Sequence, residues 1–184
     1  MISIVIPVFN EEENLALLWQ RIDAAAAGQW GGEDFEVLFV DDGSKDRSVE
    51  ILTQLAAQHP EIRVVKLSRN FGHQAALSAG LHHARGDAVV LMDADLQDPP
   101  ELVAEFLEKW REGWHVAYAV RKARKEVVWK RWSYGLFYRM LRALSSVEIP
   151  VDSGDFCLMD RRVVRVIKDE MPEQARFLRG LRAY

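Results

Sequence analysis

Two carboxylates separated by one residue stand directly after an apolar run. The run covers residues 88–92, Asp93 and Asp95 follow it, and Gln97 comes two positions later. We expect these three side chains to alternate along extended backbone. Their oxygens would then converge on one hard cation and on the hydroxyls of a ligand, an arrangement that suits a metal bridging two phosphates.

Helix capping is the alternative explanation for these acids. Asp98 is a good N-cap, with Pro99 in the first turn and Glu101 completing a capping box. Capping needs only Asp98, however, so it leaves the two preceding aspartates unexplained.

Three further polar clusters follow predicted strands, at residues 7–11, 41–44 and 68–72. In open α/β sheets ligands bind beyond the carboxyl ends of the strands, so we expect all the clusters to converge on one crevice. Taken alone, Asp42 with Gly43 is more typical of a turn. The phosphate loop of nucleotide hydrolases and the glycine fingerprint of dinucleotide enzymes are both missing, which argues against those two chemistries.

Strand and helix patterns alternate along the first 120 residues. Strands are predicted at residues 3–8, 35–40, 62–67, 87–92 and 115–120, with amphipathic helices between them. Asn10 is expected to cap the first helix, with Glu13 in the reciprocal position. This alternation predicts an α/β fold with a mainly parallel sheet covered by helices on both faces.

The pattern changes after residue 120. A long helix is predicted at 126–144, a polar turn at 152–156, and a last helix capped by Asp160. With 184 residues, of which 49% are hydrophobic, the chain is most simply one domain. A single cysteine, Cys157, excludes an intrachain disulfide and gives no zinc-type cluster. The first seven residues read as a strand and not a signal peptide, and no apolar run approaches the ~18 residues of a membrane span.

Charge is distributed unevenly. Residues 1–120 hold 20 acidic and 9 basic residues, whereas residues 121–142 hold 1 acidic and 8 basic residues. This asymmetry favours an anionic partner at one face over general affinity for nucleic acid, although a solvated helix face is the alternative. The predicted helix 126–144 mixes its bases with aromatic residues, which favours docking on an anionic membrane surface; the same aromatics could instead pack on the sheet.

Four segments together resemble one enzyme family: residues 5–12, 40–44, 67–72 and 93–101. They are similar to family two of the inverting nucleotide-sugar glycosyltransferases, and within it to the polyprenyl-phosphate branch, which includes dolichol-phosphate mannose synthases and bactoprenol glucosyltransferases. The resemblance covers essentially the whole chain. It implies a GT-A-type, Rossmann-like fold and one catalytic domain over residues 1–184, divided into a nucleotide-sugar part at 1–120 and an acceptor-side part at 121–184.

The resemblance also implies roles for single residues. Asp41 would accept a hydrogen bond from a base N–H. Asp93 would hold the ribose side or the metal, and Asp95 with Gln97 would hold Mg²⁺ or Mn²⁺ against the donor diphosphate. Asp95 would thereby be a catalytic residue. The residues implied in nucleotide-sugar binding are Pro7, Asn10, Glu11, Asp41, Asp42, Ser44, Arg69, Asp93 and Ala94.

On the acceptor side, Asp155 matches the family's aspartate and would position the acceptor phosphate or remove its proton. The alternative is a turn aspartate without function. Arg121, Arg124 and Lys125 come directly after the last predicted strand, where they would bind the lipid phosphate or the donor diphosphate.

These inferences predict a metal-dependent inverting transfer of a hexose from a nucleoside-diphosphate sugar, of the UDP-glucose or GDP-mannose type, to a polyprenyl phosphate. We expect it at the cytoplasmic face of the cell membrane. Family members usually continue into transmembrane helices after a stretch like residues 176–181, so this form is expected to be peripheral; a homo-oligomer is left open. The alternatives are a polysaccharide or other acceptor, a non-catalytic fragment that binds nucleotide or membrane, and a phospho-receiver domain suggested by Asp41 and Asp42.

Overall fold

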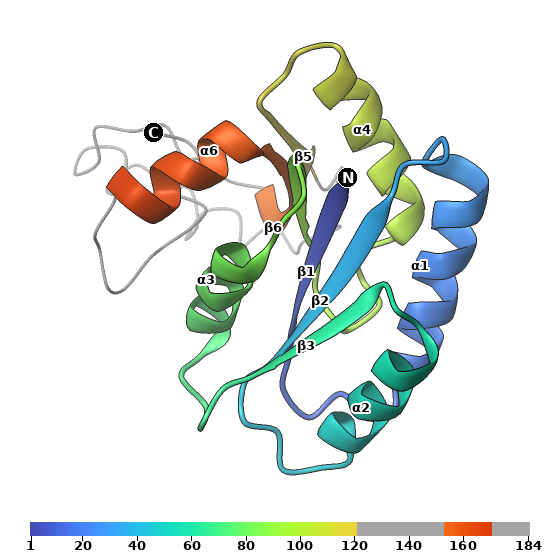
Figure 1. Cartoon of the computed structure of the whole chain (residues 1–184), viewed down its shortest axis with the longest axis vertical. Helices are drawn as coiled ribbons and strands as arrows, with labels where there is room; N and C mark the ends of the chain where they lie inside the picture. The colour runs from blue at the N-terminus through green and yellow to red at the C-terminus, as the bar shows by residue number, and fades with distance from the viewer. Residues whose placement is uncertain (121–152, 171–184) are drawn as a thin grey trace, which may run out of the picture.

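The structure is a computed structural model that describes residues 1–120 and 153–170 (Figure 1). Within this part, six strands form one sheet in the order β3-β2-β1-β4-β6-β5. The strands are β1 (Ile2–Val8), β2 (Phe35–Asp41), β3 (Ile62–Lys66), β4 (Ala88–Leu91), β5 (Val116–Val120) and β6 (Ser153–Asp160). The helices are α1 (Leu15–Gln29), α2 (Ser48–Gln58), α3 (His73–His83), α4 (Val103–Arg111) after a 3₁₀ turn η1 (Pro100–Leu102), and α6 (Arg161–Arg165), which continues into a π-helical turn η2 (Val166–Glu170).

The sheet has a parallel half and an antiparallel end. Strands β3, β2, β1 and β4 run parallel to one another, whereas β6 is antiparallel to both β4 and β5. The expected α/β class with a mainly parallel, helix-flanked sheet is therefore confirmed. Because the first four strands are parallel, their carboxyl ends lie at one edge of the sheet.

Helices cover both faces of the sheet, with α1, α2 and α4 on one face and α3 and α6 on the other (Figure 1). Every residue of β1 is buried, as expected for a central strand with two covered faces. Ile4 packs in the core beneath the first set of helices, and Val5 packs in the core beneath the second. A Cβ at Gly80 would lie 2.2 Å from Val5 Cγ1, so this glycine lets α3 approach β1 closely. In the described part of the chain, no helix combines the length and apolar character needed to cross a bilayer.

Two predicted helix caps are wrong. Helix α1 begins at Leu15, after Asn14, and Asn10 lies four residues earlier in a left-handed conformation, where its Oδ1 accepts from the Lys45 amide (2.8 Å). The asparagine is used by a neighbouring loop, so it is not available to the helix.

The predicted capping box at Asp98 is also not formed. Pro99 precedes the 3₁₀ turn, Asp98 Oδ2 accepts from the Asp93 amide (3.1 Å), and Glu101 pairs with Arg21 across the surface (2.9 Å). Asn10 and Glu101 are used by partners that are distant in the sequence, Lys45 and Arg21, whereas Asp98 accepts from an amide only five residues earlier.

The predicted polar turn at 152–156 is wrong as well, since Ser153–Asp160 is strand β6. Its residues 156–159 are buried between β4 and β5, so a polar start leads into a core strand. Asp160 caps α6 as predicted and accepts from the Arg162 amide (2.8 Å). The predicted helix 126–144 lies outside the described residues.

Candidate active site

A cavity of about 300 Å³ opens at the edge where the parallel strands end. It is lined by residues that follow β1, β2, β3 and β4, so the sequence clusters converge as predicted. The lining residues are Pro7, Val8, Phe9, Glu11, Asp42, Asn70, Gly72, His73, Asp93, Ala94 and Asp95.

A larger hollow, of about 420 Å³, lies between α4 and β5 and is lined by Trp114, Tyr118 and their neighbours. It contains none of the polar clusters that follow the parallel strands. We therefore place the chemistry in the smaller cavity, where carboxylates meet.

Hydrogen bonds join the loop after β1 to the loop after β2. The Asn10 amide donates to Ser44 Oγ (3.0 Å), and the Lys45 amide donates to Asn10 Oδ1 (2.8 Å). The Glu11 amide donates to Ser48 Oγ (2.9 Å). Glu11 lines the cavity, whereas Asn10 and Ser44 are not among the lining residues and join the two loops.

Asp41 ends β2 and is fully buried. Its two carboxylate oxygens accept from the Gly43 and Ser44 amides, each at 3.2 Å. In this structure the side chain shapes the turn after β2. Its predicted bond to a nucleobase remains a prediction.

Asp42 clamps the loop that follows β3. One carboxylate oxygen accepts from the Phe71 amide (2.7 Å) and the other from the Gly72 amide (2.9 Å). The loops also touch through Gly43, whose φ is +73° and whose added Cβ would lie 2.7 Å from the Asn70 nitrogen. Only glycine fits this position without moving the backbone. The start of α3 is therefore held by the loop that follows β2.

Aromatic side chains mark the rim of this edge. Phe9 lines the cavity and is exposed, and Phe71 is exposed with the Arg69 guanidinium 4.5 Å from its ring centroid. Arg69 thus stacks on the rim, and the residues that line the cavity do not include it.

Asp93 is the most perturbed carboxylate at the cavity. Burial raises its pKa to about 6; the nearby charge of His73 opposes the shift, whereas Asp98, Asp155 and Asp95 add to it. Its Oδ1 is buried and has no hydrogen-bond partner among the described residues. Buried polar atoms are normally satisfied, so an atom left without a donor beside a cavity suggests a missing ligand.

The expected extended arrangement of Asp93, Asp95 and Gln97 is wrong. Strand β4 ends at Leu91, and Leu96 has a φ of +64°. Asp95 Oδ1 accepts from the Gln97 amide (3.0 Å), a local turn that competes with continued strand. Asp95 still reaches the cavity beside Asp93, whereas Gln97 is exposed and is not among the lining residues.

The residues present fit a divalent cation of the magnesium type. The described residues contain no cluster of three or more histidine, cysteine or acidic side chains that would hold a metal by itself. Mg²⁺ needs no such cluster, because it is commonly bound by one or two carboxylates together with waters and substrate phosphates. Asp93 and Asp95 supply that pair, and the unpartnered Asp93 Oδ1 supplies an available oxygen.

His73 was missed by the sequence analysis. Its Nε2 lies 3.3 Å from Asp155 Oδ2 and 3.6 Å from Asp93 Oδ1. Asp155 belongs to β6 and is buried, with 7% of its side chain exposed. The signal for His73 was its position as the first residue of a helix directly after the cluster at 68–72. The predicted residue Asp155 is therefore connected to the cavity lining through His73, which the sequence did not predict.

Arg121, Arg124 and Lys125, which we predicted to bind phosphate, lie outside the described residues. The structure thus brings together the predicted residues Pro7, Glu11, Asp42, Asp93, Ala94 and Asp95.

Comparisons with known proteins agree with this arrangement. The chain is 48% identical, over 97% of its length, to the uncharacterised glycosyltransferase YkcC of Bacillus subtilis (strain 168), and covers 55% of that protein. It is 39% identical, over 98% of its length, to the prophage bactoprenol glucosyl transferase homolog of Escherichia coli (strain K12), and covers 58% of that protein. The chain therefore spans little more than half the length of the curated relatives it matches.

Among solved structures, glucosyl-3-phosphoglycerate synthase from Mycobacterium tuberculosis, crystallised with Mn²⁺, UDP and glucosyl-3-phosphoglycerate, superposes with a TM-score of 0.56 at 26% identity. The match covers 89% of this chain and 57% of the synthase. The expected GT-A-type fold is confirmed.

The family model described as glycosyl transferase family 2 matches residues 3–168, which include all four sequence clusters and Asp155. On the strength of this match, the relatives and the shared fold, the chain belongs to glycosyl transferase family 2.

Proposed function

We propose that the protein transfers a hexose from a nucleoside-diphosphate sugar to a polyprenyl phosphate, with inversion and with the help of Mg²⁺ or Mn²⁺. The observation that carries this proposal is the buried Asp93 Oδ1, which has no donor among the described residues and lies beside Asp95 in the cavity. The relative named as a bactoprenol glucosyl transferase homolog supports a polyprenyl phosphate as the acceptor.

For the donor, we assign Asp93 and Asp95 as metal ligands, with Gln97 nearby. A bound divalent cation would neutralise charge on the departing nucleoside diphosphate. Asp93 is suited to this task because its Oδ1 is buried without a hydrogen-bond partner among the described residues, so a cation would relieve an unfavourable burial.

For the nucleoside, we assign the cavity wall formed by Pro7, Glu11 and Ala94, with Asn10 and Ser44 joining the loops after β1 and β2. Asp41 would accept from a base N–H. Both of its oxygens already accept one amide hydrogen bond, and a carboxylate oxygen has a second lone pair for another.

For the acceptor, we assign Asp155 as an orienting residue and not as a strong base. A phosphate monoester has its second pKa near ~6, so the attacking oxygen already carries charge at neutral pH and needs little help to lose a proton. Attack on the anomeric carbon from the face opposite the leaving diphosphate inverts that centre. We also assign Arg121, Arg124 and Lys125 to the phosphates.

The membrane part of the proposal rests on charge. The segment 121–142, with 8 basic residues and 1 acidic residue, would attach the protein to an anionic membrane on the cytoplasmic side. In this view residues 1–120 bind the donor and residues 121–184 the acceptor, within one catalytic domain.

The test has two stages. First, thermal shifts with UDP-glucose, GDP-mannose and related donors, with and without Mn²⁺, identify the nucleotide, because a ligand that binds the folded state raises its stability. Second, the selected radiolabelled donor is incubated with polyprenyl phosphate in detergent or vesicles, and label in the lipid phase is counted. We expect metal-dependent stabilisation by one donor class and metal-dependent label in the lipid.

Two results would count against the proposal. Donor binding without any transfer to polyprenyl phosphate, but with transfer to a polysaccharide or a small phosphorylated acceptor, would change the acceptor. The structural relative that was crystallised with a glucosyl phosphoglycerate makes the second of these a concrete comparison. No stabilisation by any donor with Mn²⁺ would reject the nucleotide-sugar site itself.

A further inference from the structure

One nitrogen of the His73 imidazole lies between two carboxylates, those of Asp155 and Asp93. His73 Nε2 lies 3.3 Å from Asp155 Oδ2, which is within hydrogen-bond distance, and 3.6 Å from Asp93 Oδ1, which is not. An ionised carboxylate can only accept, so this hydrogen bond with ionised Asp155 requires the tautomer in which Nε2 carries the proton and donates. Its single proton is directed to Asp155, and Asp93 Oδ1 keeps no hydrogen-bond partner among the described residues.

The backbone that leads into His73 is held in place by the loop after β2. Asp42 receives the Phe71 and Gly72 amides on its two oxygens, and these residues immediately precede His73. The packing of Gly43 against the same loop restricts it further. Asp42 is itself buried, so the clamp that sets the start of α3 is screened from water.

We propose that His73 is a positioning residue that fixes the Asp155 carboxylate toward the acceptor and leaves the Asp93 carboxylate open to the donor side. Asp155 sits on β6, which runs antiparallel to β4, and its side chain is 7% exposed. A buried carboxylate needs a donor to hold one orientation, and the imidazole supplies one from another element. The assignment of a donor side and an acceptor side rests on the proposed function, whereas the contact between His73 and Asp155 does not.

The matched control is on the same helix. His82 lies nine residues further along α3, is exposed, and bonds to the Ser78 carbonyl (3.2 Å); it does not line the cavity. His73→Ala removes the donor, whereas His73→Gln keeps an N–H group at a similar reach. His82→Ala repeats the loss of an imidazole at a position where the ring bonds to a carbonyl and, in the described part of the chain, to no carboxylate.

The kinetic experiment measures kcat and donor KM for these variants in the full 184-residue chain. We expect His73→Ala to lower kcat about tenfold or more with donor KM within about twofold, as for loss of one charge-assisted hydrogen bond. His73→Gln should recover part of the loss, and His82→Ala should match wild type. A rise in donor KM as large as the fall in kcat, or an equal loss in His82→Ala, would overturn the proposal.

A second experiment needs no turnover. Long-range ¹H–¹⁵N spectra of histidine-labelled protein at about pH 8, above the ordinary histidine pKa of about 6.5, report which ring nitrogen carries the proton. The His73 signal is identified by its loss in His73→Gln. We expect an Nε2-protonated ring whose signal changes strongly in Asp155→Ala and less in Asp93→Ala.

The two experiments separate the possible failures. If the wild-type chain transfers no sugar to any acceptor, the proposed function fails, and the spectra alone decide the role of His73. If the His73 signal ignores Asp155→Ala, or responds more to Asp93→Ala, the positioning role is wrong whatever the kinetics show.

Discussion

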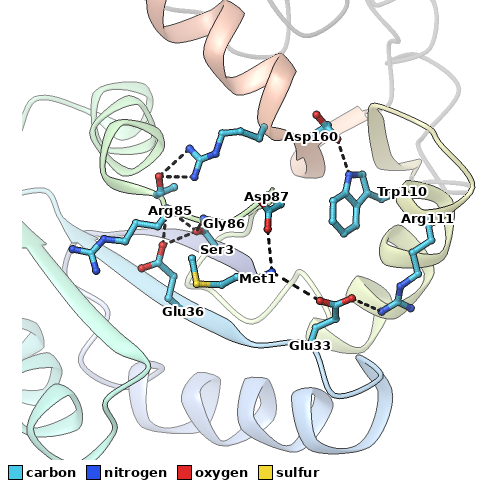
Figure 2. A network of polar contacts seen from close by, with 12 residues as sticks. Met1, Ser3, Glu33, Glu36, Arg85, Gly86, Asp87, Trp110, Arg111 and Asp160 are labelled. Carbon is cyan, nitrogen blue, oxygen red and sulfur yellow. Dashed lines mark hydrogen bonds and ion pairs between the residues drawn. The ribbon is translucent and has the colours of Figure 1, made fainter.

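Carboxylates at the amino ends and at the carboxyl ends of the parallel strands differ in their hydrogen-bond partners. At the amino end, Glu36 accepts from Ser3 Oγ (2.6 Å), the Arg85 amide (2.8 Å) and Arg63 (2.7 Å), as Figure 2 shows for Ser3 and Arg85. Burial alone would raise its pKa, but these hydrogen bonds and the Arg63 charge hold the pKa below its usual value. At the carboxyl end, Asp93 Oδ1 has no hydrogen-bond partner within residues 1–120 and 153–170, and burial raises the pKa of Asp93 to about 6.

Further polar contacts close the amino end. Figure 2 shows the Met1 amino group between Glu33 and Asp87, and the Trp110 indole donating to Asp160 (2.8 Å). These groups link β1, β4, α4 and β6. The difference between the two ends teaches that a carboxylate whose oxygens are all used supports the fold, whereas one left without donors is available to a ligand.

The largest effect is expected for Asp95→Ala. Its carboxylate is exposed and bonds only within its own turn among the contacts described, so its loss should spare the fold while removing a metal ligand. Donor affinity measured by calorimetry with Mn²⁺ should fall at least about 100-fold, with the melting temperature unchanged. Asp87→Ala, an exposed acid at the other end, is the control. Wild-type affinity in Asp95→Ala would remove Asp95 from the metal site.

Glu36→Gln should lower the stability of the fold and leave donor affinity unchanged, the reverse of Asp95→Ala. The amide cannot accept on both sides, so the buried network loses a charge and gains a misplaced donor, and urea denaturation should show a loss of about 2–3 kcal/mol. Donor affinity should not change, because this residue lies at the far end of the sheet. Weaker donor binding at full stability would break the comparison.

Glu36 should also account for part of the stability that the wild-type protein loses in acid. Since the folded-state pKa of Glu36 lies below its usual 4.5, its contribution to stability is present above that value and is lost as the pH falls through the folded pKa. Stability measured from neutral pH down to below pH 4.5 should therefore fall less steeply in Glu36→Gln than in wild type. Parallel curves would mean that Glu36 does not supply this dependence.

Asp160→Ala is expected to cost about 1–2 kcal/mol. It removes the N-cap of α6 and the acceptor for Trp110, which together fix α6 and α4 against the sheet. Asp160→Asn keeps a capping oxygen and should lose less. Urea denaturation with intrinsic tryptophan fluorescence measures both variants, and equal losses would show that the charge matters more than the cap.

The smallest effect, with the opposite sign, is expected for Asp93→Asn in chelator-treated protein. Because the folded pKa is raised from 3.8 to about 6, this carboxylate favours folding below about pH 4 and loses that contribution as the pH rises through 6. The side chain is 37% exposed, so after allowance for solvent screening the gain at pH 8 should be about 1 kcal/mol. If Asp93→Asn were less stable than wild type at pH 8, the Asp93 carboxylate would have favourable partners in solution.

The sequence by itself determined the parallel half of the fold and most of the cavity wall. Apolar runs and helix stripes are local patterns, so β1 to β4 and the helices between them lie close to where periodicity placed them. Parallel strands end at one edge, and polar residues after each strand must meet there; Asp42, Asp93 and Asp95 follow from that rule alone.

Tertiary structure decided the rest, because competing partners come from distant parts of the chain. Asn10 was expected to cap a helix and Glu101 to complete a capping box, but the Lys45 amide uses the Asn10 oxygen and Arg21 pairs with Glu101. Strand β6 has a polar start, and only its position between β4 and β5 makes it a core strand. His73 and Asp155 are 82 residues apart, and no local pattern records a contact that forms only when both are brought to the same edge. The sequence thus identified which residues could do chemistry, and the assembled sheet decided which of them are satisfied and which are left open.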